Sequence, residues 1–226
     1  MWFKSQRDLP QVITPEQALE GRRTSIPSSS IHPIFGLCIS SFDSQEHRPE
    51  HLKRILFGMG CFWGAERLFW RQPGVCMTNV GYAGGYTPNP TYEEVCSGLT
   101  GHVEVVQVYF DSKLTSLHAL LQCFWENHDP TQGMRQGNDL GTQYRSAIYW
   151  DDPADEELIQ HSVNIVNQSI SSSSTHNAEG STITTELAAA PPYYYAEAYH
   201  QQYLHTHPNG YCGLKGTGIS CNLAFE

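Results

Sequence analysis

The chain contains 226 residues, with 13 Lys and Arg against 23 Asp and Glu, and its formal net charge at pH 7 is −10. A chain of this length can bury one sizeable core, and its acidic balance without any basic run argues against nucleic acid as a partner. No apolar run reaches the roughly 20 residues that a membrane-spanning helix needs, and the N-terminus is charged where a signal peptide is apolar, so we expect a cytoplasmic protein without membrane contact.

Residues 1–50 predict an extended N-terminal arm. They are rich in Ser, Pro and charged residues and show no sustained helical or strand period. Order in this arm requires docking on the body of the protein. A regular pattern begins at His51, and we expect a single domain over residues 51–226.

The pattern from residue 52 onward alternates between strand and helix signals. We expect strands at 52–57, 75–82, 103–110, 143–150 and 181–187, and helices at 63–70, 117–127 and 153–170. This order is βαβ followed by βαβ, which is typical of an α+β sheet layered with helices.

Two later segments predict irregular structure. The serine run 171–174 is expected to form a flexible loop. Beyond Pro191-Pro192 the chain is first aromatic and then rich in glycine, from Gly210 onward. Such a tail, over about 190–226, can fold over a site but does not form long regular elements.

Seven cysteines are spread along the chain without a CxxC pair. An odd, dispersed set argues against a secreted disulfide framework and a structural zinc site. For most of the cysteines outside the tail we expect the role of a small buried hydrophobe; these are Cys38, Cys76, Cys96 and Cys123.

Cys61 is the candidate nucleophile. It lies between an expected strand end and the first turn of an expected helix, where free N–H groups and the helix dipole favour negative charge. We therefore expect its thiol to ionise more easily than the ordinary pKa of about 8.5 allows. Phe62 and Trp63 form an apolar surface beside the sulfur, and Gly60 and Gly64 let a ligand approach the backbone, which suits a small apolar group.

The segment Gly60-Cys61-Phe62-Trp63-Gly64-Ala65-Glu66 resembles the signature of the A-type peptide methionine sulfoxide reductases, which act on the S epimer of the sulfoxide. Further segments match that family in order and spacing: Gly81 to Gly85, Asn89 to Cys96, Thr100 to Glu104, His128 to Gln132 and Gln136 to Ser146. The resemblance runs from about residue 52 to 221. The arm also resembles the longer bacterial members, which carry two recycling cysteines.

The resemblance implies a two-layer α/β sandwich around a mixed sheet, with a coiled C-terminal tail and no cofactor. It places the nucleophile at Cys61, the methyl-binding aromatics at Phe62 and Trp63, and the acid at Glu104. The polar residues around the sulfoxide oxygen are Tyr92, Asp139 and Tyr144. Glu104 can supply a proton near neutral pH only if burial raises its pKa from about 4.3.

The resemblance also implies two recycling cysteines, Cys212 and Cys221. A sulfenic acid on Cys61 would condense with Cys212, and Cys221 would then attack Cys212 to leave a Cys212–Cys221 disulfide nearer the surface. Thioredoxin is the implied reductant, and damaged proteins and free methionine sulfoxide are the implied substrates. We expect the protein to be a monomer.

Three other functions use some of the same residues. A cysteine hydrolase would pair Cys61 with His102 or His128 as base and with Asp129 or Asp139 as the residue that orients it. A redox sensor would oxidise Cys61 without turnover. A metal site could draw on five histidines, although their spacing is not diagnostic and we expect no metal; they are His102, His128, His200, His205 and His207.

Overall fold

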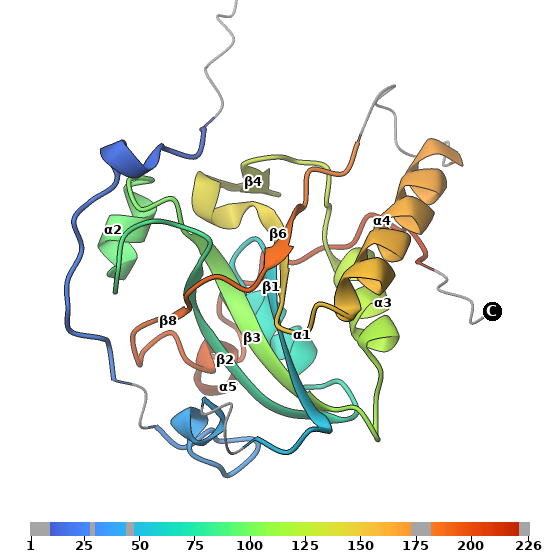
Figure 1. Cartoon of the computed structure of the whole chain (residues 1–226), viewed down its shortest axis with the longest axis horizontal. Coiled ribbons are helices and arrows are strands. Elements are labelled where there is room, and N and C mark those ends of the chain that lie inside the picture. Colours follow the sequence, from blue (N-terminus) through green and yellow to red (C-terminus); the bar gives the residue numbers. More distant parts are fainter. Residues whose placement is uncertain (1–9, 28–29, 44–47, 173–181, 222–226) are drawn as a thin grey trace, which may run out of the picture.

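The computed structural model describes residues 10–27, 30–43, 48–172 and 182–221. A mixed sheet of six strands runs through the molecule in the order β7-β6-β1-β3-β2-β8 (Figure 1). These strands are β1 (Leu52–Met59), β2 (Val75–Ala83), β3 (Val103–Asp111), β6 (Ser146–Trp150), β7 (Glu186–Ala189) and β8 (Tyr194–Tyr195).

The sheet is built from two interleaved βαβ units. Strand β3 lies between β1 and β2 and is antiparallel to both, so the unit β1-α1-β2 is split by a strand. Likewise β1 lies between β3 and β6, the strands that α3 connects. The longer helices are α1 (Phe62–Phe69), α3 (Leu117–Asn127) and α4 (Asp155–Ser172). The α+β fold with ferredoxin-like βαβ elements is thereby confirmed.

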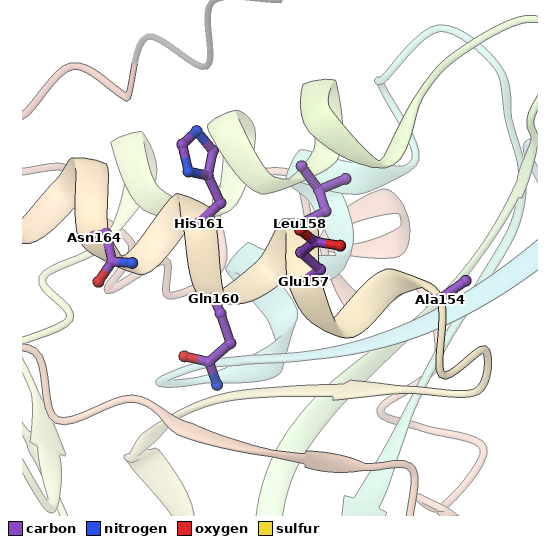
Figure 2. Close-up of a pocket in the computed structure, with 6 residues that line it drawn as sticks. All are labelled: Ala154, Glu157, Leu158, Gln160, His161 and Asn164. Atoms are coloured by element: carbon purple, nitrogen blue, oxygen red, sulfur yellow. The ribbon is translucent and has the colours of Figure 1, made fainter.

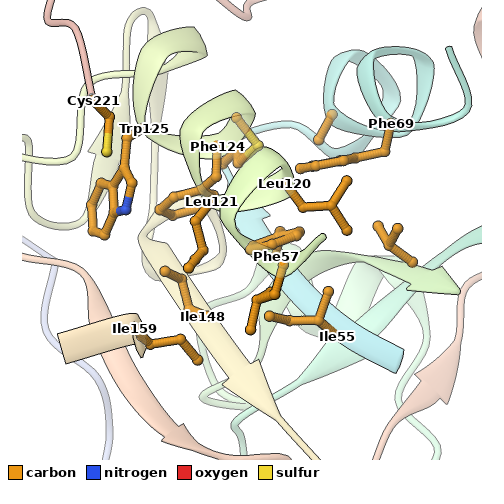
Figure 3. Close-up of a cluster of buried hydrophobic side chains, with 14 of the residues drawn as sticks. Ile55, Phe57, Phe69, Leu120, Leu121, Phe124, Trp125, Ile148, Ile159 and Cys221 are labelled. Carbon is orange, nitrogen blue, oxygen red and sulfur yellow. The ribbon is translucent and has the colours of Figure 1, made fainter. Parts of the chain in front are cut away.

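One face of the sheet carries the main hydrophobic core. Phe57 of β1 stacks on Phe69 of α1 and on Phe124 of α3, with ring centroids 4.7 and 5.1 Å apart. Figure 3 shows these rings with Ile148 of β6 and Trp125 of α3, all enclosed between the sheet and the helices. Burial of this apolar surface fixes α1 against the end of β1.

The N-terminal arm and the segment before β8 cover the opposite face. Ile39, in the short helix η2 (Ile39–Phe42), is fully buried against Met77 and Tyr109. Nearer the N-terminus, after η1 (Pro15–Gln17), Arg22 donates to Glu94 over 2.7 Å. The described part of the arm is thus docked on the body through both apolar and polar contacts.

The structure adds short elements that sequence periodicity does not predict. They are α2 (Tyr92–Cys96), β4 (Arg135–Gln136), β5 (Asp139–Leu140), η4 (Thr142–Tyr144) and α5 (Tyr203–Thr206). Elements of two to five residues complete no full apolar period, so no pattern marks them.

Several expected boundaries shift, most of them by one or two residues. The strand expected at 143–150 begins only at Ser146, because the preceding residues form η4. The helix expected at 153–170 spans Asp155–Ser172 and so takes in the first two serines of the expected loop; residues 173 and 174 lie outside the described residues.

The strand expected at 181–187 is displaced to Glu186–Ala189, where it pairs in parallel with β6. Residue 181 lies outside the described residues. The backbone N–H and the hydroxyl of Thr184 both donate to the carbonyl of Pro130, at 2.8 and 3.0 Å. This loop contact takes Thr184 out of the strand ladder.

Within the described ranges, none of the helices is both long and apolar enough to span a bilayer.

Candidate active site

Cys61 lies where β1 passes into α1. Gly60 has φ +84, and a Cβ at that position would lie 2.6 Å from Cβ of Gln136, so only glycine fits this turn. Cys61 then caps the N-terminus of α1 in a non-helical conformation. The sequence-based position of the thiol, between a strand and the first turn of a helix, is therefore correct.

Glu104 lies beside this helix start, on β3. It is 2% exposed, and its Oε2 accepts a hydrogen bond of 3.1 Å from the backbone N–H of Phe62. Burial raises the pKa of the Glu104 carboxyl to about 8, with Asp139 adding to the rise and the Phe62 N–H opposing it. The condition for a proton donor near neutral pH, burial with a raised pKa, is met.

The expected easy ionisation of Cys61 is wrong for this arrangement. Burial raises the pKa of the Cys61 thiol, and the neighbouring Glu104 carboxyl raises it further, whereas a backbone hydrogen bond from Trp63 lowers it. The first free N–H of α1 is bonded to Glu104 and is not available to the sulfur. Desolvation therefore outweighs the helix terminus, and the thiol is protonated at rest.

Phe62 and Trp63 form an aromatic wall next to the thiol. Phe62 is 1% exposed, and its ring centroid lies 5.1 Å from that of His200. Trp63 is half-buried and stacks on Tyr203 with centroids 3.9 Å apart, and its Nε1–H donates to Nδ1 of His200 over 3.1 Å. An apolar group beside Cys61 would meet these rings.

Three polar side chains lie around Glu104 and Cys61. Burial raises the pKa values of the Tyr92 and Tyr144 phenols, and Glu104 is close enough to raise both further. Asp139 is close enough to Cys61 to raise the pKa of its thiol. Both phenols are thus neutral hydrogen-bond donors at physiological pH.

The C-terminal tail lies across the start of α1. A Cβ at Gly64 would lie 3.0 Å from Sγ of Cys212, so the tail packs closely against α1 at this glycine. The hydroxyl of Tyr211 donates to Oδ2 of Asp139 over 3.0 Å. These contacts bring Cys212 near Cys61, in agreement with its effect on the Cys61 pKa.

Cys221 is placed differently. It is fully buried in the main core, where Figure 3 shows it beside Trp125, and its backbone N–H donates to Glu126 over 3.1 Å. In this reduced arrangement the thiol is shielded from any external reductant. The exchange with Cys212 expected from the sequence would require Cys221 to leave this cluster.

Several residues at the site have no distinguishing signal in the sequence. His200 and Tyr203 back Trp63, and the Tyr82 hydroxyl donates to Oε2 of Glu197, whose Oε1 accepts from the backbone N–H of Tyr92. Of these residues, only those in the aromatic stretch after Pro192 lie in a segment that the sequence marked, as part of a tail able to fold over a site.

Cys96, expected to be buried, is exposed on α2.

The two histidines of the hydrolase hypothesis have other partners. His102 accepts from the Gly85 N–H at Nδ1 and contacts the Thr87 carbonyl at Nε2, over 3.0 and 2.8 Å. Both ring nitrogens of His128 are also bonded, to Phe124 and Ser146. Neither ring is available as a base for Cys61. In the described ranges no three metal-ligating side chains converge.

A concave region of about 550 Å³ lies along α4 (Figure 2). It is lined by Ala154, Glu157, Leu158, Gln160, His161 and Asn164. None of the residues around Cys61 lines it, and we assign it no role in the chemistry.

Comparison with known proteins identifies close relatives. The sequence model of the family described as peptide methionine sulfoxide reductase matches residues 53–222. The peptide methionine sulfoxide reductase MsrA of Brucella anthropi is 57% identical over 222 residues, which cover 98% of this chain and 97% of the relative. The MsrA of Brucella ovis is 52% identical over the same shares of both chains.

Solved structures of similar proteins have the same fold. Methionine sulfoxide reductase A of Corynebacterium diphtheriae superposes with a TM-score of 0.74 and 40% identity, covering 96% of this chain and all of that one. Mxr1 from Saccharomyces cerevisiae in reduced form gives a TM-score of 0.64 and 32% identity, covering 79% of this chain and 93% of that one.

Proposed function

This chain belongs to the peptide methionine sulfoxide reductase family, and from that premise we propose that it reduces the S epimer of methionine sulfoxide with Cys61 as the oxygen acceptor. The observation that carries the assignment of roles is the Glu104 carboxyl, buried beside Cys61 with a pKa of about 8. Such a carboxyl is protonated at neutral pH and can give its proton to the sulfoxide oxygen.

The first step exchanges one oxygen atom. The methyl group packs against Phe62 and Trp63, and Glu104 protonates the oxygen while the Cys61 sulfur attacks the substrate sulfur. The proton lost from the thiol restores the acid form of Glu104. The products are the thioether and a Cys61 sulfenic acid, so the substrate gains the two electrons that Cys61 loses.

The polar residues Tyr92, Asp139 and Tyr144 complete the site. Both phenols are neutral, so each can donate a hydrogen bond to the sulfoxide oxygen as it gains negative charge. Asp139 holds the Tyr211 hydroxyl and thereby keeps the tail near the thiol.

The recycling steps use the tail. The Cys212 thiol condenses with the sulfenic acid, which releases water and forms the Cys61–Cys212 disulfide. The Cys221 thiolate then attacks Cys212, which returns Cys61 as a thiol and leaves a Cys212–Cys221 disulfide. A dithiol protein, for which we propose thioredoxin, reduces that disulfide and becomes oxidised itself.

Incubation with resolved sulfoxide epimers and dithiothreitol tests the assignment. We expect methionine from the S epimer only, and none from either epimer with Cys61→Ser. Equal conversion of both epimers would exclude the proposed stereochemistry. Oxidation of Cys61 without steady-state turnover would favour the redox sensor instead.

We also propose that the protein works as a monomer in the cytoplasm on both damaged proteins and free methionine sulfoxide. A thioredoxin-dependent cycle needs a reducing compartment, which supports this location. Light scattering of the purified chain and fractionation of the source cells test the two statements, and a stable dimer or a membrane-associated pool would contradict them.

A further inference from the structure

Four consecutive residues, His200 to Tyr203, lie behind the tryptophan of the site. Nδ1 of His200 accepts from Nε1–H of Trp63 over 3.1 Å. The ring of Tyr203 stacks on the indole with an interplanar angle of 20°. One contact fixes the rotation of the indole and the other fixes its tilt. The position of Trp63 therefore depends on where this segment is held.

Gln201 attaches the segment to the sheet. Its side-chain amide accepts from the Val80 N–H over 3.0 Å and donates to the Val80 carbonyl over 2.8 Å. Strand β8 pairs with β2 only at the next two residues, Gly81 and Tyr82. The Val80 carbonyl also accepts from the Ala196 N–H over 3.0 Å, so the Gln201 amide binds both backbone groups of Val80 beside the last backbone bond of the ladder.

Gln202 attaches the segment to α1 through Glu66. Its backbone N–H donates to Oε2 of Glu66 over 2.8 Å, and its Nε2 donates to Oε1 over 2.7 Å. Gln202 has φ +48, a conformation that is uncommon for residues other than glycine. The two bonds to one carboxyl group hold the backbone in this conformation.

Glu66 has no ionic partner among the described residues. It is fully buried, and its one further hydrogen bond comes from the Thr78 hydroxyl over 3.3 Å. A buried carboxyl without a cation is unfavourable for the folded state. Its hydrogen bonds do little for the α1 helix itself, but two of them fix Gln202, which lies between the residues that contact Trp63.

We propose that Glu66 is a positioning residue for the substrate pocket: through Gln202 it holds His200 and Tyr203 against Trp63, so that the indole presents a fixed face to the methyl group. This inference rests on the proposed function, because it assumes that Trp63 contacts the substrate. Glu66 itself touches neither substrate nor thiol in this account.

A double-mutant cycle with Trp63 tests the inference. With methionine S-sulfoxide and dithiothreitol, Glu66→Ala should raise KM roughly tenfold, which lies within the coupling range of residues in one hydrogen-bond network, and should leave kcat within about twofold. In the Trp63→Ala background the same substitution should change KM by less than about twofold. A tenfold rise in both backgrounds would show that Glu66 does not act through Trp63 and would overturn the proposal.

Two further variants keep the test valid if Glu66→Ala folds poorly. Glu66→Gln keeps an acceptor for the Gln202 N–H and should recover most of the lost affinity. Gln202→Ala removes the side-chain hydrogen bond to Glu66 and replaces Gln202 with a residue that does not favour the left-handed conformation, so it should raise KM in the same direction. Wild-type KM in the Gln202→Ala variant would contradict the proposal.

Ser162→Ala is the matched control. It removes a buried hydrogen bond of 2.9 Å to Nε1 of Trp125, another tryptophan, which lies in the main core. It should lower stability without changing KM. A KM rise equal to that of Glu66→Ala would mean that general loosening moves the pocket, and the proposal would be wrong. If the wild type failed to reduce the S epimer at all, the proposed function would fail instead.

Discussion

The surroundings of Glu104 and Cys61 set the pKa of each side chain. The sequence places Cys61 at a helix start, and that position is correct. The low pKa expected from it is wrong, because burial raises the pKa of the Cys61 thiol and the Glu104 carboxyl raises it further, by more than the backbone hydrogen bond from Trp63 lowers it. Glu104 is buried because it lies on β3, which has a neighbouring strand on each side, β1 and β2. No local sequence pattern predicts that position in the sheet. The family resemblance named the residue, and the structure supplies the burial its role requires.

Glu104→Gln should lower kcat/KM by at least about a hundredfold, since a positioned general acid contributes roughly 10²- to 10⁴-fold. In the wild type, activity should fall as pH rises through about 8, where Glu104 loses its proton. Steady-state kinetics from pH 6 to 10 measures both effects. The same alkaline fall in the Gln variant would assign the titration to another group.

The same substitution should change the pH dependence of stability. Between the unfolded pKa of about 4.3 and the folded value of about 8, the folded chain keeps a proton that the unfolded chain has released. The free energy of unfolding therefore decreases as pH rises through this range, and burial of Glu66, with its pKa raised to about 7, acts with the same sign. Glu104→Gln should flatten this decrease in urea titrations, and an unchanged slope would contradict the raised pKa.

Trp63→Ala should weaken substrate capture, because loss of a large aromatic contact costs on the order of 1 to 3 kcal/mol of binding free energy. The result should be a higher KM with a smaller change in kcat. Trp70→Ala is a control on the same helix, since Trp70 caps the C-terminus of α1 at the end opposite Cys61. Unchanged kcat/KM in Trp63→Ala would mean that Trp63 only packs in the protein.

At the scale of elements, the long periodic strands and helices were predictable and the short ones were not. The strands of the two βαβ units and the helices α1, α3 and α4 follow from apolar periodicity. In contrast, β8 and α5 depend on contacts with residues far away in the sequence, such as Gln201 with Val80. Their positions are set by the assembled sheet, so a local reading of the tail could only predict irregular structure.

Gly64→Ala tests the contact between α1 and the tail. Alanine favours the helix by roughly 1 kcal/mol over glycine, but its Cβ would lie 3.0 Å from Sγ of Cys212 and 3.1 Å from Cβ of Leu214. We therefore expect a normal first step and slower formation of the Cys61–Cys212 disulfide. Rapid quench after one equivalent of substrate measures the two rates separately. Equal rates of disulfide formation in variant and wild type would show that the tail is free to shift.

Replacement of each of the two tail cysteines should stop the catalytic cycle at a different step. Cys221→Ser should stop at the Cys61–Cys212 disulfide, because both partners remain. Cys212→Ser should keep the sulfenic acid, and thioredoxin-driven activity should fall more than activity driven by a small thiol. Mass spectrometry after one dose of substrate distinguishes these species, with Cys123→Ser as a control cysteine on α3. If wild type never accumulated a Cys212–Cys221 disulfide, the relay would be wrong although the reductase assignment would stand.

At the scale of the whole molecule, the main core and the recycling chemistry are connected. Cys221 lies in the same hydrophobic cluster as Phe57 and Trp125, so the proposed attack on Cys212 would expose a thiol that is fully buried in this structure. Sequence reasoning predicted a tail able to fold over the site. It could not predict that Cys221 is buried in the core, because that depends on how the tail packs against α3.

The most direct test of the account follows the oxygen atom. The Cys212→Ser variant is mixed with one equivalent of methionine S-sulfoxide that carries a heavy oxygen isotope. The masses of the intact protein and of its peptides are then measured by mass spectrometry. We expect one methionine per protein and the heavy oxygen on Cys61 as sulfenic acid. Methionine formed without label on Cys61, or label on any other cysteine, would contradict Cys61 as the oxygen acceptor.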